Sequence, residues 1–405
     1  MAYDKGMRGT VRVLTVGRDP NKRITRENMK YPPSSPARLS PSSVVIGVDV
    51  HKYSHSAVAM DAWGQEKGRL EFNNETLSDY TLWLKGLGQQ SDIIVGLEDA
   101  NCYGVHIAEK LRKEGFFMRS VPAILTERER KHSTKREKSD YEDAKRVGKV
   151  ILTKYEETLP AKESIADEDE LRIARELDLL LMERRDLVKQ KTILKNQLHG
   201  LLHQYYGDHY RNRFKKPFCR EAVAFWLGDL EETAKAEEGL KRILASGIIR
   251  RIHHLGLTEE QITVISSEIS TVGAHSPAVA ALSQYLHGCG TMTAAAITAE
   301  LITIKRFPSR DKLAMYAGVA PRRHSSGRHD RLYTNPFGNR LLNRALHTVA
   351  LSQIAVKGDT RGKEYYQKKL QEGKTKLWAL RCLKRQIVNQ VFRTLRNQLA
   401  AVPIA

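Results

Sequence analysis

Apolar positions change their spacing along the chain, and each spacing predicts a different element. The run VVIGVDV (44–50) is short, apolar and β-branched, which is typical of a buried strand. HSAVAMDAWG (55–64) and GRLEFNN (68–74) predict two more strands, joined by a turn at Gly64. The pattern then predicts a helix over 76–88, a strand over 93–100, a helix over 103–114, a strand over 116–122 and a helix over 139–152.

Three strands followed by helix, strand, helix, strand and helix is the element order of an RNase H-like (RuvC-like) domain. Other α/β domains share parts of this order, so the order alone does not settle the fold. We place this domain at 43–160. Residues 1–42 are rich in Arg, Lys, Pro and Ser without periodicity, and we expect them to form a flexible basic extension.

Helical periodicity dominates the rest of the chain. Residues 164–205 contain neither Pro nor Gly before Gly200. Apolar residues recur there every seven positions, at Ile173, Leu180, Leu187, Leu194 and Leu201. This spacing predicts a coiled coil, and a long helix packed on one side explains it equally well. Shorter helices and loops are expected over 206–275, which makes 161–275 a helical or coiled-coil connector.

The last segment, 276–405, is predicted to be mostly helical. A Gly-Cys-Gly turn at 288–290 precedes a helix of small residues, and the backbone amides of such a turn can hold a phosphate. The chain closes with a basic helical stretch that starts at Thr375. The predicted fold class is therefore α/β plus α.

Charge favours a polyanionic partner. The 405 residues include 67 Lys and Arg against 47 Asp and Glu, a formal net charge of +20. An excess of this size attracts nucleic acid through counterion release, although a generally basic protein or a membrane-surface binder would also carry it. No apolar run predicts a membrane span, and the N-terminus does not predict export. Four widely spaced cysteines fit a reducing cytoplasm.

Four carboxylates are candidate metal ligands. Asp49 lies in a buried strand, where a charge is costly unless it is paired or metal-bound. Glu98 ends the fourth strand, which neighbours the first strand in RNase H-like sheets, and Asp99 competes for that role. Asp140 and Asp143 share one helix face, although alone they could be a helix cap and a solvated acid. Converging oxygen ligands suit Mg²⁺ or Mn²⁺, which can clamp both reacting oxygens of a phosphodiester.

Two basic stretches are candidate nucleic-acid contacts. The first precedes Asp140 and contains Arg128, Arg130, Lys131, Lys135 and Arg136. It is a candidate backbone-binding loop, but its interleaved glutamates also permit a solvated helix. The second stretch surrounds Ser325 and Ser326 with Arg322, Arg323 and Arg328. Gly327 lets the backbone turn and present a hydroxyl, and the arginines can hold phosphate, whereas the alternative is a basic loop with an incidental serine.

Together these motifs resemble those of the DEDD-type insertion-sequence transposases. These are the families numbered one hundred and ten and eleven-eleven, also called bridge-RNA-guided recombinases and related to pilin-gene invertases. GVDVHK matches the motif of the first Asp at Asp49, GLEDA that of the Glu at Glu98, and KSDYEDA those of Asp140 and Asp143. FPSRDKLAMYAGVAPRRHSSG matches the run that ends in Ser-Gly, which points to Ser326 as nucleophile with Ser325 beside it. The resemblance covers nearly the whole chain after residue 43.

The resemblance implies a DNA transposase and recombinase that forms a phosphoserine intermediate, with Mg²⁺ or Mn²⁺ at the carboxylates. It also implies double-stranded donor and target DNA, an element-encoded guide RNA, and a homo-oligomer, either dimer or tetramer. Such a protein would act at the nucleoid in the cytoplasm of a prokaryotic cell.

Two other functions compete with this one. A junction-resolving endonuclease needs the same acids without the serine. A catalytically silent nucleic-acid-binding protein needs neither, and four intact acids count against it.

Overall fold

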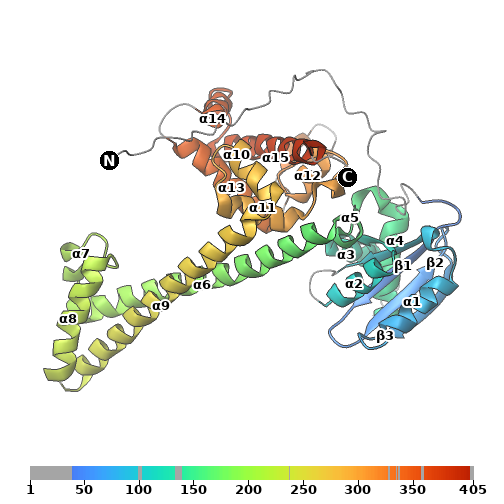
Figure 1. The fold of residues 1–405 in the computed structure, drawn as a ribbon. Helices are drawn as coiled ribbons and strands as arrows, with labels where there is room; N and C mark the ends of the chain where they lie inside the picture. Colours follow the sequence, from blue (N-terminus) through green and yellow to red (C-terminus); the bar gives the residue numbers. More distant parts are fainter. Residues whose placement is uncertain are drawn as a thin grey trace, which may run out of the picture.

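The computed structural model describes residues 39–98, 103–132, 139–236, 238–326, 329–333, 335, 338–356 and 360–401. Side chains are not described over 322–332. Residues 1–38 of the predicted basic extension (1–42) lie outside the described residues. Figure 1 shows three parts: a sheet domain, an arm of two long helices, and a helical C-terminal domain packed beside the root of the arm.

The N-terminal part is built on one mixed sheet with the strand order β3-β2-β1-β4-β5-β6. The strands are β1 (Val44–Val50), β2 (His55–Met60), β3 (Glu66–Phe72), β4 (Ile93–Leu97), β5 (Phe117–Ser120) and β6 (Leu159–Pro160). Strand β1 pairs antiparallel with β2 and parallel with β4. The first five strands were predicted, and the sheet is consistent with an RNase H-like domain. The two residues of β6 are too few to produce a sequence pattern.

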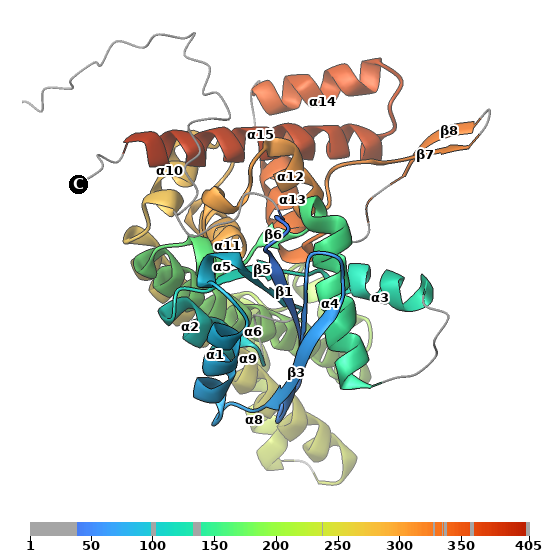
Figure 2. The same ribbon diagram turned by 90° about the vertical axis from the view of Figure 1, so that its right-hand side faces the viewer.

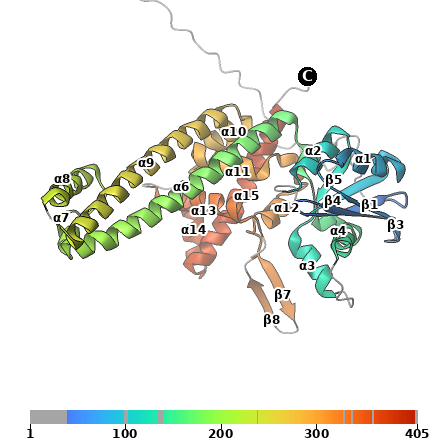
Figure 3. The same cartoon turned by 90° about the horizontal axis from the view of Figure 1, so that it is seen from below.

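Helices cover both faces of this sheet (Figures 2 and 3). On one face lie α1 (Leu77–Gly86) and α2 (Val105–Lys113), and on the other lie α3 (Ala123–His132) and α4 (Asp140–Lys154). Successive residues of β1 point to opposite faces, so Ile46 packs in the core beneath α1 and α2 while Val45 packs against α4.

Two glycines of the sheet let α4 approach it closely. Gly47 of β1 and Gly96 of β4 are partners in the parallel register. A Cβ atom on Gly47 would lie 1.9 Å from the backbone oxygen of Ala144 and 2.4 Å from the backbone nitrogen of Gly148. A Cβ atom on Gly96 would lie 2.4 Å from Cδ1 of Ile151. The helix backbone therefore rests directly on the strand backbone.

The arm consists of α6 (Glu168–Tyr206), which comes after the short α5 (Lys162–Ile165), and α9 (Leu240–Ala274). Helices α7 (His209–Arg213) and α8 (Arg220–Ala236) form its far end (Figure 1). The expectation of only shorter helices over 206–275 was wrong, because α9 is one helix of 35 residues. Gly247 and Gly256 weaken its helical signal, and packing along α6 stabilises the helix instead.

The heptad positions of α6 are covered by the chain itself. Ile173 is buried in the C-terminal core, and Leu180 and Leu187 pack against that core. Leu194 is buried among the helices at the far end, and Leu201 packs against the same cluster. The apolar spacing therefore results from packing along one side of a long helix within the chain.

The C-terminal part contains α10 (Pro277–Tyr285), α11 (Thr291–Leu301), α12 (Arg310–Tyr316), α13 (Arg340–Ala355), α14 (Arg361–Gln371) and α15 (Lys376–Ala401). It also carries an antiparallel hairpin of β7 (Arg322–Ser326) and β8 (His329–Tyr333), where the sequence suggested a basic loop. Buried Arg306 joins this part to the sheet domain, because its Nε donates to the carbonyl of Pro160 over 3.1 Å.

Replacing Gly47 with alanine should separate α4 from β1. The added Cβ meets backbone atoms that cannot rotate away, so we expect a loss of about 3 kcal/mol in the free energy of unfolding, at the upper end of overpacking costs. Urea denaturation measures this loss. Gly228→Ala is the matched control, because nothing lies within 4 Å of a Cβ at that helical glycine and alanine favours the helix. Equal stability of Gly47→Ala and wild type would contradict the close contact.

Candidate active site

The site begins with Asp49, near the end of β1. Side chains alternate along the strand, so Asp49 follows Val45 and Gly47 on the face that α4 covers. Its side chain is 17% exposed, in contrast to the fully buried Val48 before it. The carboxylate thus emerges where the buried part of the strand ends.

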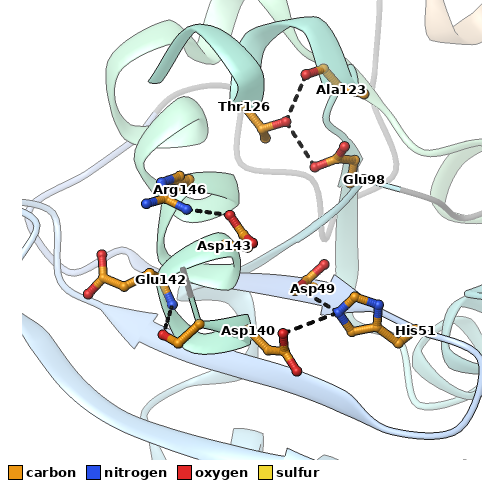
Figure 4. Close-up of polar contacts among 10 residues, drawn as sticks. Asp49, His51, Glu98, Ala123, Thr126, Asp140, Glu142, Asp143 and Arg146 are labelled. Carbon is orange, nitrogen blue, oxygen red and sulfur yellow. Dashed lines mark hydrogen bonds and ion pairs between the residues drawn. The ribbon is translucent and has the colours of Figure 1, made fainter. Parts of the chain in front are cut away.

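Helix α4 brings two further carboxylates to the same place. Ser139 caps the helix and accepts a hydrogen bond of 3.2 Å from the backbone N–H of Glu142. Asp140 and Asp143 both lie in the first turn, where the helix dipole favours negative charge. Because the contact at Gly47 lies one turn further along the helix, this first turn projects beside Asp49 (Figure 4).

His51 links the two elements. Its Nε2 lies 3.0 Å from Oδ2 of Asp49 and 3.6 Å from Oδ1 of Asp140. No role for His51 was predicted from the sequence. The sequence signal that could have identified it is its spacing: in an extended chain, a residue two positions after Asp49 points to the same side as Asp49.

The electrostatics of this corner favour an added positive charge. Burial raises the pKa of the Asp49 carboxyl, His51 lowers it, and the nearby carboxylates of Asp143 and Asp140 raise it. A pKa raised by burial and by like charges means that the ionised carboxylate is destabilised where it stands. A cation shared between the carboxylates would remove that cost.

Glu98 and Asp143 point to other partners. Glu98, directly after β4, accepts a hydrogen bond of 2.9 Å from Oγ1 of Thr126, whose hydroxyl also donates to the carbonyl of Ala123. Asp143 pairs with the buried guanidinium of Arg146 (Figure 4). Neither Thr126 nor Arg146 was identified from the sequence. Asp99, the alternative to Glu98, lies outside the described residues.

The donor atoms suit a divalent cation. Within the described part of the chain, Asp49, His51 and Asp140 each offer one ligand atom, and these atoms lie within 4.8 Å of one another. Carboxylate oxygens suit Mg²⁺ and Mn²⁺, and an imidazole nitrogen suits the transition metals. Glu98 and Asp143 border this group from β4 and α4 without belonging to it in this arrangement (Figure 4).

The candidate serine is remote from these acids. Ser326 is the last residue of β7 and pairs in register with His329 of β8. The hairpin projects away from the C-terminal domain, and in Figure 2 it stands well apart from β1. The side chains of Ser325, Ser326, Arg322 and Arg323, and the whole of Arg328, lie outside the described atoms.

The first basic stretch is helical where it is described. Arg128, Arg130 and Lys131 lie in the last turns of α3, so the loop interpretation is wrong for them. Arg130 and Lys131 are exposed, and Lys131 pairs with Glu127 over 2.8 Å. Lys135 and Arg136 lie outside the described residues.

Among the helices that are described, none is both long and apolar enough to cross a membrane.

Comparison with known proteins matches two stretches of the chain to models of one transposase family. Residues 46–207 match the family model of the DEDD transposases of the IS110 type, and residues 280–367 match the transposase family IS116/IS110/IS902. An uncharacterized 43.6 kDa protein of the insertion element IS110 from Streptomyces coelicolor is 24% identical over 392 residues, covering 87% of this chain and 94% of that protein. Membership in a DEDD family implies the use of a divalent metal ion. The chain is an IS110-family DEDD transposase, an enzyme that cuts and rejoins DNA.

Proposed function

We propose that this transposase cuts DNA with a divalent metal site made by Asp49, Glu98, Asp140 and Asp143, and with Ser326 as its nucleophile. The observation that carries the proposal is the convergence of Asp49 and Asp140 on one position from two different elements, with His51 between them. The fold holds these carboxylates close together despite their mutual repulsion, and a cation bound between them would explain that arrangement.

The acids have distinct tasks in this proposal. Asp49, His51 and Asp140 would hold the ion, and Glu98 and Asp143 would join them by turning away from Thr126 and Arg146. When bound, Mg²⁺ or Mn²⁺ supplies positive charge against the phosphate oxygens during displacement. Arg146 would hold the Asp143 carboxylate beside the site by its ion pair until that carboxylate turns toward the metal ion, because a guanidinium stays charged at any working pH.

The serine would carry the strand between cleavage and rejoining. A bond forms between Oγ of Ser326 and phosphorus while the bond from phosphorus to the departing deoxyribose oxygen breaks. The serine loses its proton and the departing oxygen gains one, so the phosphodiester energy is conserved in the phosphoserine. Arg322, Arg323 and Arg328 would bind the neighbouring phosphates.

Two copies of the chain would build one complete site. The hairpin that carries Ser326 projects away from the sheet, which supports pairing the serine of one copy with the carboxylates of another (Figure 2). The enzyme would then be a dimer or a tetramer working at the nucleoid.

The nucleic-acid partners would be donor and target DNA and an element-encoded guide RNA. The net charge of +20 supports polyanion binding. Helix α3, with Arg128, Arg130 and Lys131, projects on the same side of the molecule as the hairpin (Figures 2 and 3). A cavity of about 540 Å³ between α3 and α12 is lined by Arg128, Lys312 and Arg306, together with Glu157. We infer that this side faces the nucleic acid, together with Lys135 and Arg136.

The first test is metal binding without catalysis. Mn²⁺ titrated into the protein and followed by electron paramagnetic resonance should bind wild type. Asp49→Asn and Asp140→Asn should each bind about a hundredfold more weakly, because each removes a ligand rather than an outer partner. Glu142→Gln is the control, since Glu142 lies in the same helix turn and points away from the site (Figure 4). Unchanged Mn²⁺ affinity in Asp140→Asn would remove this residue from the metal site.

The second test separates a serine recombinase from a junction-resolving endonuclease. On a denaturing gel, trapped reactions of wild type should contain a covalent protein–DNA species, and mass mapping should locate it at Ser326. Ser326→Ala should bind DNA without forming it, whereas Ser325→Ala should keep most of the activity. Efficient cleavage without adduct in wild type, matched by Ser326→Ala, would favour the endonuclease.

The third test concerns the guide. Protein purified through a high-salt wash should retain one discrete structured RNA encoded beside its own gene, because specific contacts survive when counterion-driven binding is lost. Sequencing the extracted RNA measures this. A mixture of cellular RNAs that salt removes completely would contradict an RNA-guided mechanism.

A further inference from the structure

A second pocket lies at the root of the β7–β8 hairpin. Its walls are the link from α12 to β7 (318–321), the end of β8 with Asn335, one face of α14, and the first turns of α15. In Figure 2 the hairpin leaves the domain where α14 and α15 come together, which places this pocket beside the strand that leads to Ser326.

Glycine contacts fix the backbone wall of this pocket. Gly318 has a φ of +66°, which suits glycine, and a Cβ atom on Gly338 would lie 2.1 Å from the Cα of Gly318. The chain before the hairpin therefore touches the chain after it. Asn343 Nδ2 adds a hydrogen bond of 2.7 Å to the carbonyl of Ala317. These contacts fix the 318–321 wall of the pocket, and Tyr333 joins the lining from the end of β8.

Three aromatic rings line the pocket, contributed by Tyr333, Tyr365 and Trp378. Tyr333 as a whole residue is 51% exposed. The guanidinium carbon of Arg381 lies over the ring of Trp378, 5.0 Å from its centre, so one face of the indole carries a cation and a base would stack on the other face. Accessible rings that flank a cation are the usual platform for an unstacked nucleobase and its phosphate.

The charges in the pocket are all positive. Its described lining includes Arg381, Lys384 and Arg385 and no carboxylate. Arg385 is engaged by Asp311 outside the lining, whereas Lys384 donates to the amide oxygen of Asn343 over 2.8 Å. Burial, with Arg381 nearby, lowers the pKa of Lys384, as expected for a cation that has no anionic partner among the described residues. The side-chain amides of Asn335, Asn343 and Gln386 complete a polar edge.

We propose that this pocket binds one unpaired nucleotide of a nucleic-acid strand, with the base against Trp378 and the phosphate at Arg381 and Lys384. The cavity of about 330 Å³ is at the small end of ligand sites, roughly 300–1,000 Å³, and suits a single nucleotide. Aromatic rings for the base and cations for the phosphate suit a nucleotide better than a cationic or a purely apolar ligand. The proposal rests on the chain being a nucleic-acid enzyme.

A nucleotide held here would anchor the strand beside the hairpin. Strand β7 begins and strand β8 ends at this pocket, because Pro321 precedes β7 and Tyr333 is the last residue of β8. A base drawn out of its helix and stacked on Trp378 would therefore position the adjoining phosphates along the hairpin. The pocket thus has a positioning role, separate from the carboxylates and from the serine.

The test uses a single-stranded DNA oligonucleotide that carries one 2-aminopurine, whose fluorescence falls when the base stacks. Wild type should bind it and quench the emission. Trp378→Ala should lose the quench and bind about tenfold more weakly, the order of effect that loss of one base–aromatic stack produces. Trp378→Phe keeps a ring and should recover part of both signals. Trp63→Ala is the matched control, because Trp63 is 74% exposed and lies outside the pocket.

The outcomes separate the pocket from the proposed function. Equal binding and quenching by wild type and Trp378→Ala would overturn the pocket alone. Adenosine monophosphate that displaced the oligonucleotide at the oligonucleotide's own concentration would overturn the assignment to a strand and indicate a free nucleotide. A wild type that bound neither the strand nor a duplex of the same sequence would overturn the proposed function as well.

Discussion

The direct contact between the backbones of β1 and α4 determines the geometry of the carboxylate site. Gly47 and Gly148 meet where almost any side chain would hold the two elements apart, and Gly96 leaves room for Ile151 beside them. That contact sets the distance between Asp49 and each acidic residue in the first turn of α4. A helix seated on ordinary side chains would stand about 10 Å from the sheet, the usual spacing of packed layers, and its carboxylates would be out of reach.

Apolar burial compensates the repulsion that this contact creates. Val147, Val150 and Ile151 of α4 pack with Val45, Ile94 and Phe117 of the sheet, and each such side chain contributes roughly 1.5–3 kcal/mol when it is fully buried. The carboxylates in the first turn of the same helix repel one another and Asp49, and contacts with His51 and Arg146 offset part of that repulsion. The buried apolar side chains between α4 and the sheet therefore hold the carboxylates close together, in an arrangement that a cation would stabilise.

The sequence predicted most of the sheet domain and less of the arm and the C-terminal domain. Continuous apolar runs and the Ser139 cap identify β1, β4 and α4 locally. Asp49 and Glu98 were found because they interrupt such runs, and Asp140 and Asp143 because their spacing places them on one helix face. His51 escaped notice because a histidine after a strand has many ordinary explanations. The length of α9 and the hairpin depend on contacts distant in sequence. Glycines interrupt the helix pattern of α9, and β7 is a run of polar residues without alternation. Tertiary packing decides such segments, and a local pattern cannot show it.

Helix α6 has a consequence for the order in which the protein is made. The sheet is complete with β6 at Pro160, whereas α6 must wait for α9 and for a core that extends to Leu395 before Ile173 and Leu177 are covered. During synthesis, a finished sheet domain therefore precedes a helix of 39 residues, about 58 Å long, with a bare apolar side. During that interval the uncovered apolar side of α6 can aggregate or associate with a nascent chain on a neighbouring ribosome. Translation that stopped within this interval would release a fragment that contains the carboxylates of β1 and α4 but lacks the β7–β8 hairpin.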